Sequence, residues 1–193
     1  MCATLPAFTT IKYKVVANRL SDQPIVSSKN GSYWKYNYNA AVFTKNNQVG
    51  LVVRVQNLLN DSEPFIPTAS HLAVSTVTFA NDGTVSATPT TKDTTPLMPP
   101  AETKGTEDPR ITFKDGIYYL FYTAYDGIRA MLSSAISTNP FDPNSWVRMS
   151  DFDLPLRNWS KSGAAFFASK DNGLDQDYLF WGDSSFPVGG NFF

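Results

Sequence analysis

One tight group of charged residues in the sequence could transfer a proton, the tetrapeptide Glu107-Asp108-Pro109-Arg110. It places two carboxyl groups and a guanidinium around a proline. A carboxyl group can act as a general acid or base when it lies within hydrogen-bond reach of the reacting atoms. An alternative that needs no ligand is a salt-bridged turn, in which Arg110 holds Asp108 and Pro109 fixes the bend.

Short strands joined by polar turns surround this group. A dense apolar run, "ITFKDGIYYLFYTAY", follows it directly and predicts a hairpin around "KDG". Two more hairpins are predicted, "NAAVF" to "VGLVVRV" and "GAAFFAS" to "DYLFWG". Because apolar residues almost nowhere recur with helical spacing, the sequence predicts an all-β protein.

The hairpins recur in a fixed order. Each of the first two is followed by a further strand-like run, "SHLAVSTVTF" or "IRAMLSSAIS", and then by a weaker one, "TVSAT" or "WVRM". The second strands begin near Val49, Ile117 and Tyr178, so a four-stranded meander repeats about three times. Radially stacked meanders predict a β-propeller of the five-bladed type, with a β-sandwich as the less favoured alternative.

We expect a single partial propeller domain over residues 1–193, with blades at about 30–95, 100–152 and 158–193. Only two strands of the third meander are recognisable. We therefore expect the chain to be the N-terminal part of a longer protein, inactive and poorly soluble alone because its last aromatic edge strand is exposed.

Composition narrows the functional class. Aromatic residues make up 14% of the 193 residues, charged residues 17%, and the net charge is −1, which argues against disorder and nucleic-acid binding. No apolar run reaches the roughly 18 residues of a membrane span, and the absence of a secretory pattern slightly favours the cytoplasm. With Cys2 as the single cysteine, a thiolate metal site is not expected, nor is any cofactor.

A propeller would bring several charged side chains to one rim of its central channel. The innermost strand of each blade lines that channel, and aligning the hairpins places Asn39, Asp108 and Lys161 at comparable strand starts. Glu107 and Arg110 should face the same funnel, where converging polar groups suit a small polar ligand.

Two basic residues near this rim each have a structural alternative. Arg54, at the end of "GLVVR", either points towards the funnel or forms an ion pair between blades, and the ion pair is the favoured interpretation. Lys161 either contacts the ligand or is a plain surface lysine.

The stretch "GTEDPRITFKDGIYYLFYTAYDG" resembles the central signature of glycoside hydrolase family 130. The segments "RLSDQPIV", "YNYNAAVFTKNNQVGLVVRVQN" and "KSGAAFF" follow the order of that family, so the resemblance covers most of the chain. It implies a five-bladed propeller that acts on β-linked mannosides as a phosphorylase or a mannosidase. A furanosidase-like glycoside hydrolase and a non-catalytic carbohydrate-binding propeller stay open as alternatives.

The resemblance implies that Asp108 is the single catalytic acid. It would protonate the glycosidic oxygen through the mannose 3-hydroxyl, while phosphate or water attacks the anomeric carbon with inversion. Arg54 and Lys161 match basic or sugar-contacting positions. The remaining candidates for lining the site are Asn39, Glu107, Arg110, Tyr125, Asp126 and Asp183.

Two departures from the family pattern weaken the case for inorganic phosphate as co-substrate. A His-Arg pair that helps many of these phosphorylases bind phosphate has no counterpart in "YLFWGDSS". Lys161 is flanked by Ser160 and Ser162, where an Asn and an Asp are usual. Hydrolysis therefore stays open, as do the linkage, the acceptor sugar and the oligomeric state.

Overall fold

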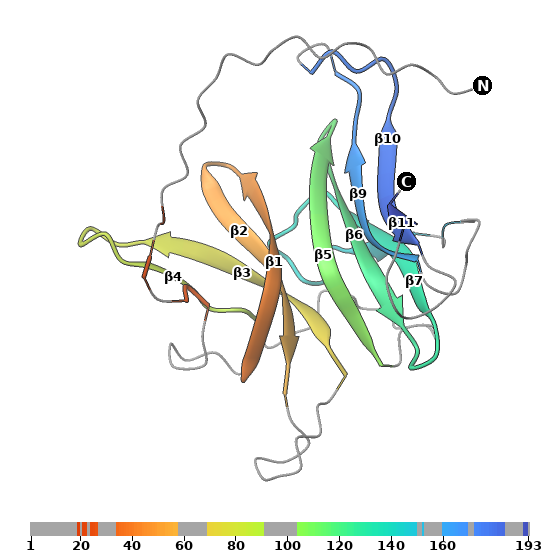
Figure 1. Cartoon of the computed structure of the whole chain (residues 1–193). Coiled ribbons are helices and arrows are strands. Elements are labelled where there is room, and N and C mark those ends of the chain that lie inside the picture. Colours follow the sequence, from red (N-terminus) through yellow and green to blue (C-terminus); the bar gives the residue numbers. More distant parts are fainter. Residues whose placement is uncertain are drawn as a thin grey trace, which may run out of the picture.

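The structure, a computed structural model, describes residues 19, 21–22, 24–26, 34–57, 69–90, 104–149, 152, 160–169, 172–183 and 191–192. These residues contain strands and turns but no helix, so none of their elements is a helix that could span a membrane. The strands form three antiparallel sheets (Figure 1).

Each sheet is a meander in which strands that follow one another in the sequence pair. The first contains β1 (Tyr36–Lys45), β2 (Gln48–Gln56), β3 (His71–Phe79) and β4 (Val85–Ala87). The second contains β5 (Gly105–Lys114), β6 (Ile117–Tyr125), β7 (Ala130–Ser137) and β8 (Val147–Arg148). The third contains β9 (Ser160–Phe166), β10 (Tyr178–Asp183) and β11 (Asn191–Phe192).

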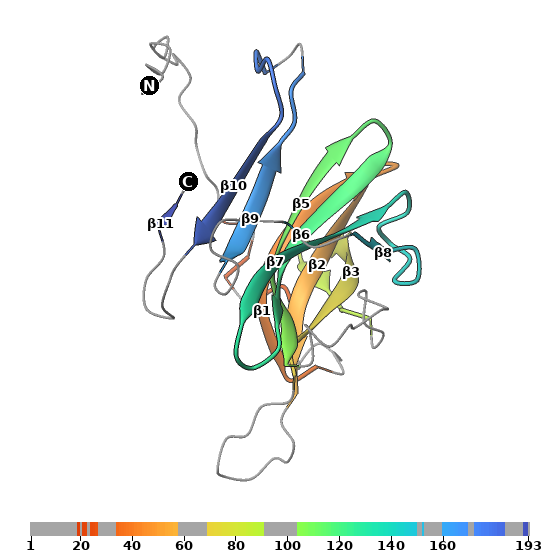
Figure 2. The same cartoon turned by 90° about the vertical axis from the view of Figure 1, so that its right-hand side faces the viewer.

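The third sheet corrects one expectation from the sequence. Two strands were predicted there, but β11 pairs with the end of β10 and adds a third (Figure 2). A strand of two residues has no periodicity of its own, so hydrophobic alternation could not reveal it.

Tight turns explain the two long hairpins. Lys45 pairs with Gln48 across Asn46 and Asn47, whose φ angles are 51° and 62°. Lys114 pairs with Ile117 across Asp115 and Gly116 in the same way, with φ angles of 51° and 83°. Two-residue turns with both φ angles positive favour Asn, Asp and Gly, and their twist matches that of the paired strands.

The first strands of the three sheets, β1, β5 and β9, lie side by side and run in the same direction (Figure 1). Neighbouring sheets lie against each other along these strands. Sheets arranged as blades around their first strands form a β-propeller, which confirms the predicted all-β propeller fold.

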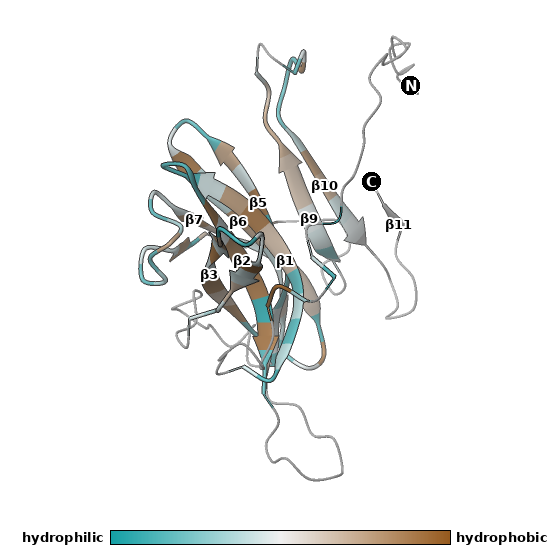
Figure 3. Cartoon of the chain, turned by 90° about the vertical axis from the view of Figure 1, so that its left-hand side faces the viewer, coloured by the Kyte–Doolittle hydropathy of each residue, from teal (hydrophilic) through white to brown (hydrophobic). Residues whose placement is uncertain are grey.

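Apolar residues form cores between the blades, and hydrophilic residues are concentrated in the turns (Figure 3). In β6, Tyr118, Leu120 and Tyr122 belong to the core shared with the first blade. Phe121, on the opposite face of β6, belongs to the core shared with the third blade, together with Ala165. The period of two in a strand thus lets one strand contribute to both cores.

Candidate active site

Each inner strand carries a β-bulge at the same place. In β1, Tyr38 and Asn39 face Arg54; in β5, Asp108 and Pro109 face Tyr122; in β9, Ser162 and Gly163 face Trp181. A bulge bends its strand and re-aims the side chains of the extra residues, and bulges are frequent beside active sites.

The bulges establish which residues are equivalent in the three blades. Tyr38, Asp108 and Ser162 occupy the first bulge position. The equivalence predicted from the sequence, of Asn39, Asp108 and Lys161, is therefore wrong by one residue in β1 and by one in β9. An extra residue in a strand shifts the register without changing the residue types that mark the strand.

Asp108 and Ser162 share an uncommon backbone conformation, with φ angles of 51° and 56°. Residues other than glycine seldom adopt positive φ, although aspartate tolerates it better than most. Such conformations gather at functional sites, where the surrounding structure offsets their cost. In β5 this conformation displays a carboxyl group at the rim, where the sequence predicts the catalytic acid.

The carboxyl group of Asp108 is held on one side only. Asn39 Nδ2 donates a hydrogen bond to Oδ1 at 2.8 Å, and a terminal nitrogen of Arg54 (NH1) lies 3.6 Å from the same oxygen. The side chain is 20% exposed. Within the described residues Oδ2 has no hydrogen-bond partner. One oxygen is thus fixed by the protein and the other is available to a ligand.

Arg54 connects the first blade to the second. Its other terminal nitrogen (NH2) donates to Glu107 Oε1 at 2.8 Å, and its guanidinium carbon lies 5.2 Å from the centre of the Tyr38 ring. Ser70 Oγ donates to the same Glu107 oxygen at 3.4 Å. Arg54 therefore forms the predicted ion pair between blades and at the same time lies beside the candidate acid.

Arg110 is not the partner of either carboxylate. Its side chain (NH1) donates to the carbonyl oxygen of Pro109 at 2.8 Å, and among the described residues it forms no ion pair with Asp108 or Glu107. The alternative interpretation of the motif, a turn in which Arg110 holds Asp108, therefore does not match the structure. The guanidinium of Arg110 instead binds the backbone of the bulge that contains Asp108.

The other predicted site residues have local roles or lie at the surface. The hydroxyl of Tyr125 donates to Gly127 O at 3.0 Å. Asp126 Oδ1 accepts the backbone N–H groups of Arg129 and Ile128, at 2.6 and 2.7 Å. These bonds, that from Arg129 first, lower the pKa of the Asp126 carboxyl. Both residues thus stabilise the turn after β6.

The third blade contributes two of the predicted residues. Lys161 is exposed at the start of β9, where its backbone pairs with Gly182, and its side chain has no partner among the described residues. Asp183 is the last residue of β10, where its backbone pairs with Ser160 and Asn191.

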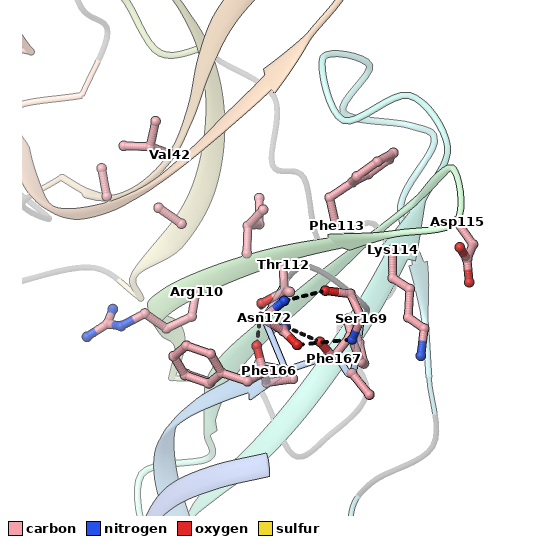
Figure 4. A pocket seen from close by; sticks show the side chains of 16 residues that line it. Val42, Arg110, Thr112, Phe113, Lys114, Asp115, Phe166, Phe167, Ser169 and Asn172 are labelled. Carbon is pink, nitrogen blue, oxygen red and sulfur yellow. Dashed lines mark hydrogen bonds between the residues drawn. The ribbon is translucent and has the colours of Figure 1, made fainter. Parts of the chain in front are cut away.

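A pocket of about 700 Å³ runs along the channel side of the three inner strands. Arg110 lies at one end of it, and Lys114 and Asp115 lie at the other (Figure 4). Asp108 does not line this pocket. The hollow and the carboxyl cluster are therefore separate features. In the described part of the chain, no group of three or more His, Cys, Asp or Glu could hold a metal ion.

Sequence reasoning missed three residues near the rim, namely Tyr38, Ser70 and Ser162. Tyr38 stacks with Arg54, and Ser70 supports Glu107. Ser70 lies before β3 rather than on an inner strand, so no alignment of hairpins could find it. Ser162 becomes visible only once the bulges align the blades.

No protein-family model and no curated protein matches the sequence of the chain. Solved structures match its fold. A β-1,2-mannobiose phosphorylase from Listeria innocua, in complex with β-1,2-mannobiose, matches with a TM-score of 0.58 and 16% identity, over 79% of this chain and 52% of the other. An α-L-arabinofuranosidase from Lactobacillus brevis matches with a TM-score of 0.55 and 16% identity, over 80% and 47%.

A third similar structure is described as showing that the GH130 family of mannoside phosphorylases contains glycoside hydrolases that target β-1,2-mannosidic linkages in Candida mannan. It matches with a TM-score of 0.55 and 18% identity, over 83% of this chain and 50% of the other. The chain spans about half the length of these structures. Its three blades have the fold of the five-bladed propeller glycosidases, among them the GH130 mannoside phosphorylases that its central motif resembles.

Proposed function

We propose that this protein is a glycoside-processing enzyme that cleaves β-linked mannosides with inversion, and that Asp108 is its catalytic acid. The observation that carries the proposal is the state of the Asp108 carboxyl group. Its Oδ1 is fixed by Asn39 and approached by Arg54, while its Oδ2 is unpaired among the described residues. The resemblance of the central motif and the likeness of the fold support the same function.

In this proposal, one oxygen of the Asp108 carboxyl group, Oδ2, donates the proton. Because Asn39 donates to Oδ1, the proton of the neutral acid resides on Oδ2. Oδ2 gives this proton to a sugar hydroxyl, and that hydroxyl passes its own proton to the glycosidic oxygen. The bond between the anomeric carbon and the leaving oxygen breaks as an oxygen of phosphate or water attacks from the opposite face.

The choice between phosphate and water depends on a base. Inverting hydrolysis uses a second carboxylate, spaced to admit a water, that takes a proton from it. Glu107 is the carboxylate next to Asp108, and Arg54 already holds it. Phosphate is anionic and needs no such base. The residues around Asp108 are therefore compatible with phosphorolysis. The lack of a His-Arg pair in "YLFWGDSS" is instead an argument for attack by water.

Product analysis on the full protein distinguishes the two reactions. With β-1,2-mannobiose, a phosphorylase releases mannose 1-phosphate only when phosphate is present, whereas a hydrolase releases mannose in either case. Hydrolysis of an arabinofuranoside instead would favour the function of the Lactobacillus brevis enzyme. Binding of mannobiose without turnover would indicate a carbohydrate-binding propeller.

The role of Asp108 is tested by Asp108→Asn in the full protein. General acid catalysis typically contributes about 10²–10⁴-fold in rate, so kcat should fall by at least that order while Tm stays nearly unchanged. Asp115→Asn is the matched control, because Asp115 is an exposed aspartate with the same φ of 51° in the turn after β5. A structural role for Asp108 predicts the opposite result, a lower Tm with activity per folded molecule retained.

A further inference from the structure

Ser162 is the counterpart of Asp108 in the third blade. Both occupy the first position of a bulge in an inner strand, and their φ angles differ by only a few degrees, 56° against 51°. The same register and the same backbone conformation direct the two side chains in the same way relative to their strands. Ser162 therefore presents a hydroxyl where Asp108 presents a carboxyl group.

The two residues also lie at the same level of the propeller. Thr112 Oγ1 of β5 donates to Ala165 O of β9 at 2.8 Å. Thr112 is four residues beyond Asp108, and Ala165 is three residues beyond Ser162. Because β5 and β9 run side by side in the same direction (Figure 1), their bulges are level to within about one residue, or about 3.3 Å. Both side chains thus belong to the same rim.

The bulge in β9 packs closely against β7 of the second blade. A Cβ atom on Gly163 would lie 2.4 Å from Leu132 Cδ1, so the backbone of β9 sits directly against β7 of the second blade. Ser160 Oγ accepts a hydrogen bond from the backbone N–H of Leu132 at 3.1 Å. In contrast, the hydroxyl of Ser162 has no partner among the described residues. A strand that packs against the second blade therefore carries a hydroxyl with no partner among the described residues.

The positive φ of Ser162 would cost less free energy with a glycine than with a serine. The backbone alone therefore does not account for a serine at this position. We propose that Ser162 is a substrate-binding residue, whose hydroxyl hydrogen-bonds a hydroxyl of the sugar that Asp108 protonates. The inference rests on the proposed function. The serine hydroxyl is uncharged and can both donate and accept a hydrogen bond, which suits a neutral sugar hydroxyl. The neighbouring ammonium of Lys161 can only donate, so Ser162 is the residue of this pair that can respond to how a sugar hydroxyl is oriented.

Ser162→Gly tests this role, because it removes the hydroxyl without adding backbone strain. Loss of one uncharged hydrogen bond should lower kcat/KM on the mannoside about tenfold, or about 1.4 kcal/mol. The same variant and the unaltered protein are then compared on monodeoxy mannosides. For the analogue that lacks the partner hydroxyl, the two proteins should have equal kcat/KM. Asn47→Gly, at a φ of 62° in the turn after β1, is the matched control and should leave kcat/KM unchanged.

The outcomes separate this inference from the function on which it rests. If the unaltered protein cleaves mannosides and Asp108→Asn does not, but Ser162→Gly retains full kcat/KM, the role of Ser162 is wrong and the proposed function stands. If Ser162→Gly lowers kcat/KM equally on every deoxy analogue, Ser162 supports the fold of the rim and binds no sugar hydroxyl. If the unaltered protein neither binds nor cleaves any glycoside, both proposals are overturned.

Discussion

Arg54 of β2 and Glu107 of β5 form an ion pair between two blades, with 2.8 Å between the guanidinium nitrogen and Oε1. Their side chains are 23% and 25% exposed, so water screens the pair only in part. The same guanidinium lies 3.6 Å from the carboxyl group of Asp108. The contact that joins the blades is therefore also part of the candidate site.

Glu107→Gln should lower the free energy of unfolding by about 1–3 kcal/mol, because it replaces the closer of the two carboxylates beside a partly buried guanidinium with an uncharged amide. Urea denaturation of Glu107→Gln, Arg54→Met and the double variant gives the coupling energy. Asp177→Asn, which breaks the more exposed pair with Lys114, provides the comparison and should cost less. Equal losses in the two cases would show that the Arg54–Glu107 pair has no special role between the blades.

Asn39 positions the carboxyl group of Asp108 through the 2.8 Å hydrogen bond from Nδ2. Asn39→Ala should lower kcat/KM about tenfold, because Asp108 loses the donor that orients it. Asn39→Asp should lower it further, since a second carboxylate would face the first. Steady-state kinetics on the mannoside measure both effects, and Tm controls for folding. If the alanine variant were the slower of the two, orientation through Nδ2 would not be the role of Asn39.

Gly163 is a point of close contact between the second and third blades. Gly163→Ala would place a Cβ atom 2.4 Å from Leu132 Cδ1, and Leu132 is almost fully buried. The resulting overpacking should cost about 1–3 kcal/mol of stability, measured by urea denaturation. Ala164→Gly, the reverse exchange at the next position of the same strand, is the comparison variant. Gly173→Ala would not serve, because the φ of Gly173 is positive at 68° and alanine would be strained there. A neutral Gly163→Ala would contradict this packing of β9 against β7.

Asp177 should make stability depend on pH in the acid range. The backbone N–H of Ala168, at 2.7 Å, and then the ammonium of Lys114 lower the pKa of the Asp177 carboxyl from its ordinary 3.8. Because the pKa of Asp177 is lower in the folded state, its charged carboxyl group stabilises the fold above pH 3.8. This stabilisation is lost as the pH falls below that value. Asp177→Asn should therefore lower Tm at pH 7, and the difference from the unaltered protein should vanish at strongly acidic pH. Thermal unfolding of both proteins across this range checks the sign.

The hairpins and the order of the blades could be predicted because their causes are local. The turn residues Asn46, Asn47, Asp115 and Gly116 are types that tolerate positive φ. The continuous apolar and aromatic run of β6 is typical of a strand buried on both faces. The second strands of the blades begin at Gln48, Ile117 and Tyr178, close to the predicted positions. Local residue types were sufficient for these elements.

The site was harder to predict because its geometry depends on non-local contacts. The bulges shift the register by one residue, and only the pairing of Asp108 and Pro109 opposite Tyr122 reveals this. Sequence adjacency suggested Arg110 as the partner of the acids, whereas Arg54, on another blade, takes that role. A charge that lies 53 residues away cannot be recognised from the motif itself.

The residue types at the bulges of the three inner strands differ, although the strand pairing is the same. Tyr38, Asp108 and Ser162 stand where an extra residue leaves the regular ladder, so their side chains can be exchanged without removing the pairs that hold each blade. An aromatic ring, an acid and an alcohol already occupy the three equivalent positions of one repeated scaffold. If the proposed function holds, single substitutions at these three bulge positions should change substrate preference, in evolution or by engineering, while the strand pairing of each meander stays the same.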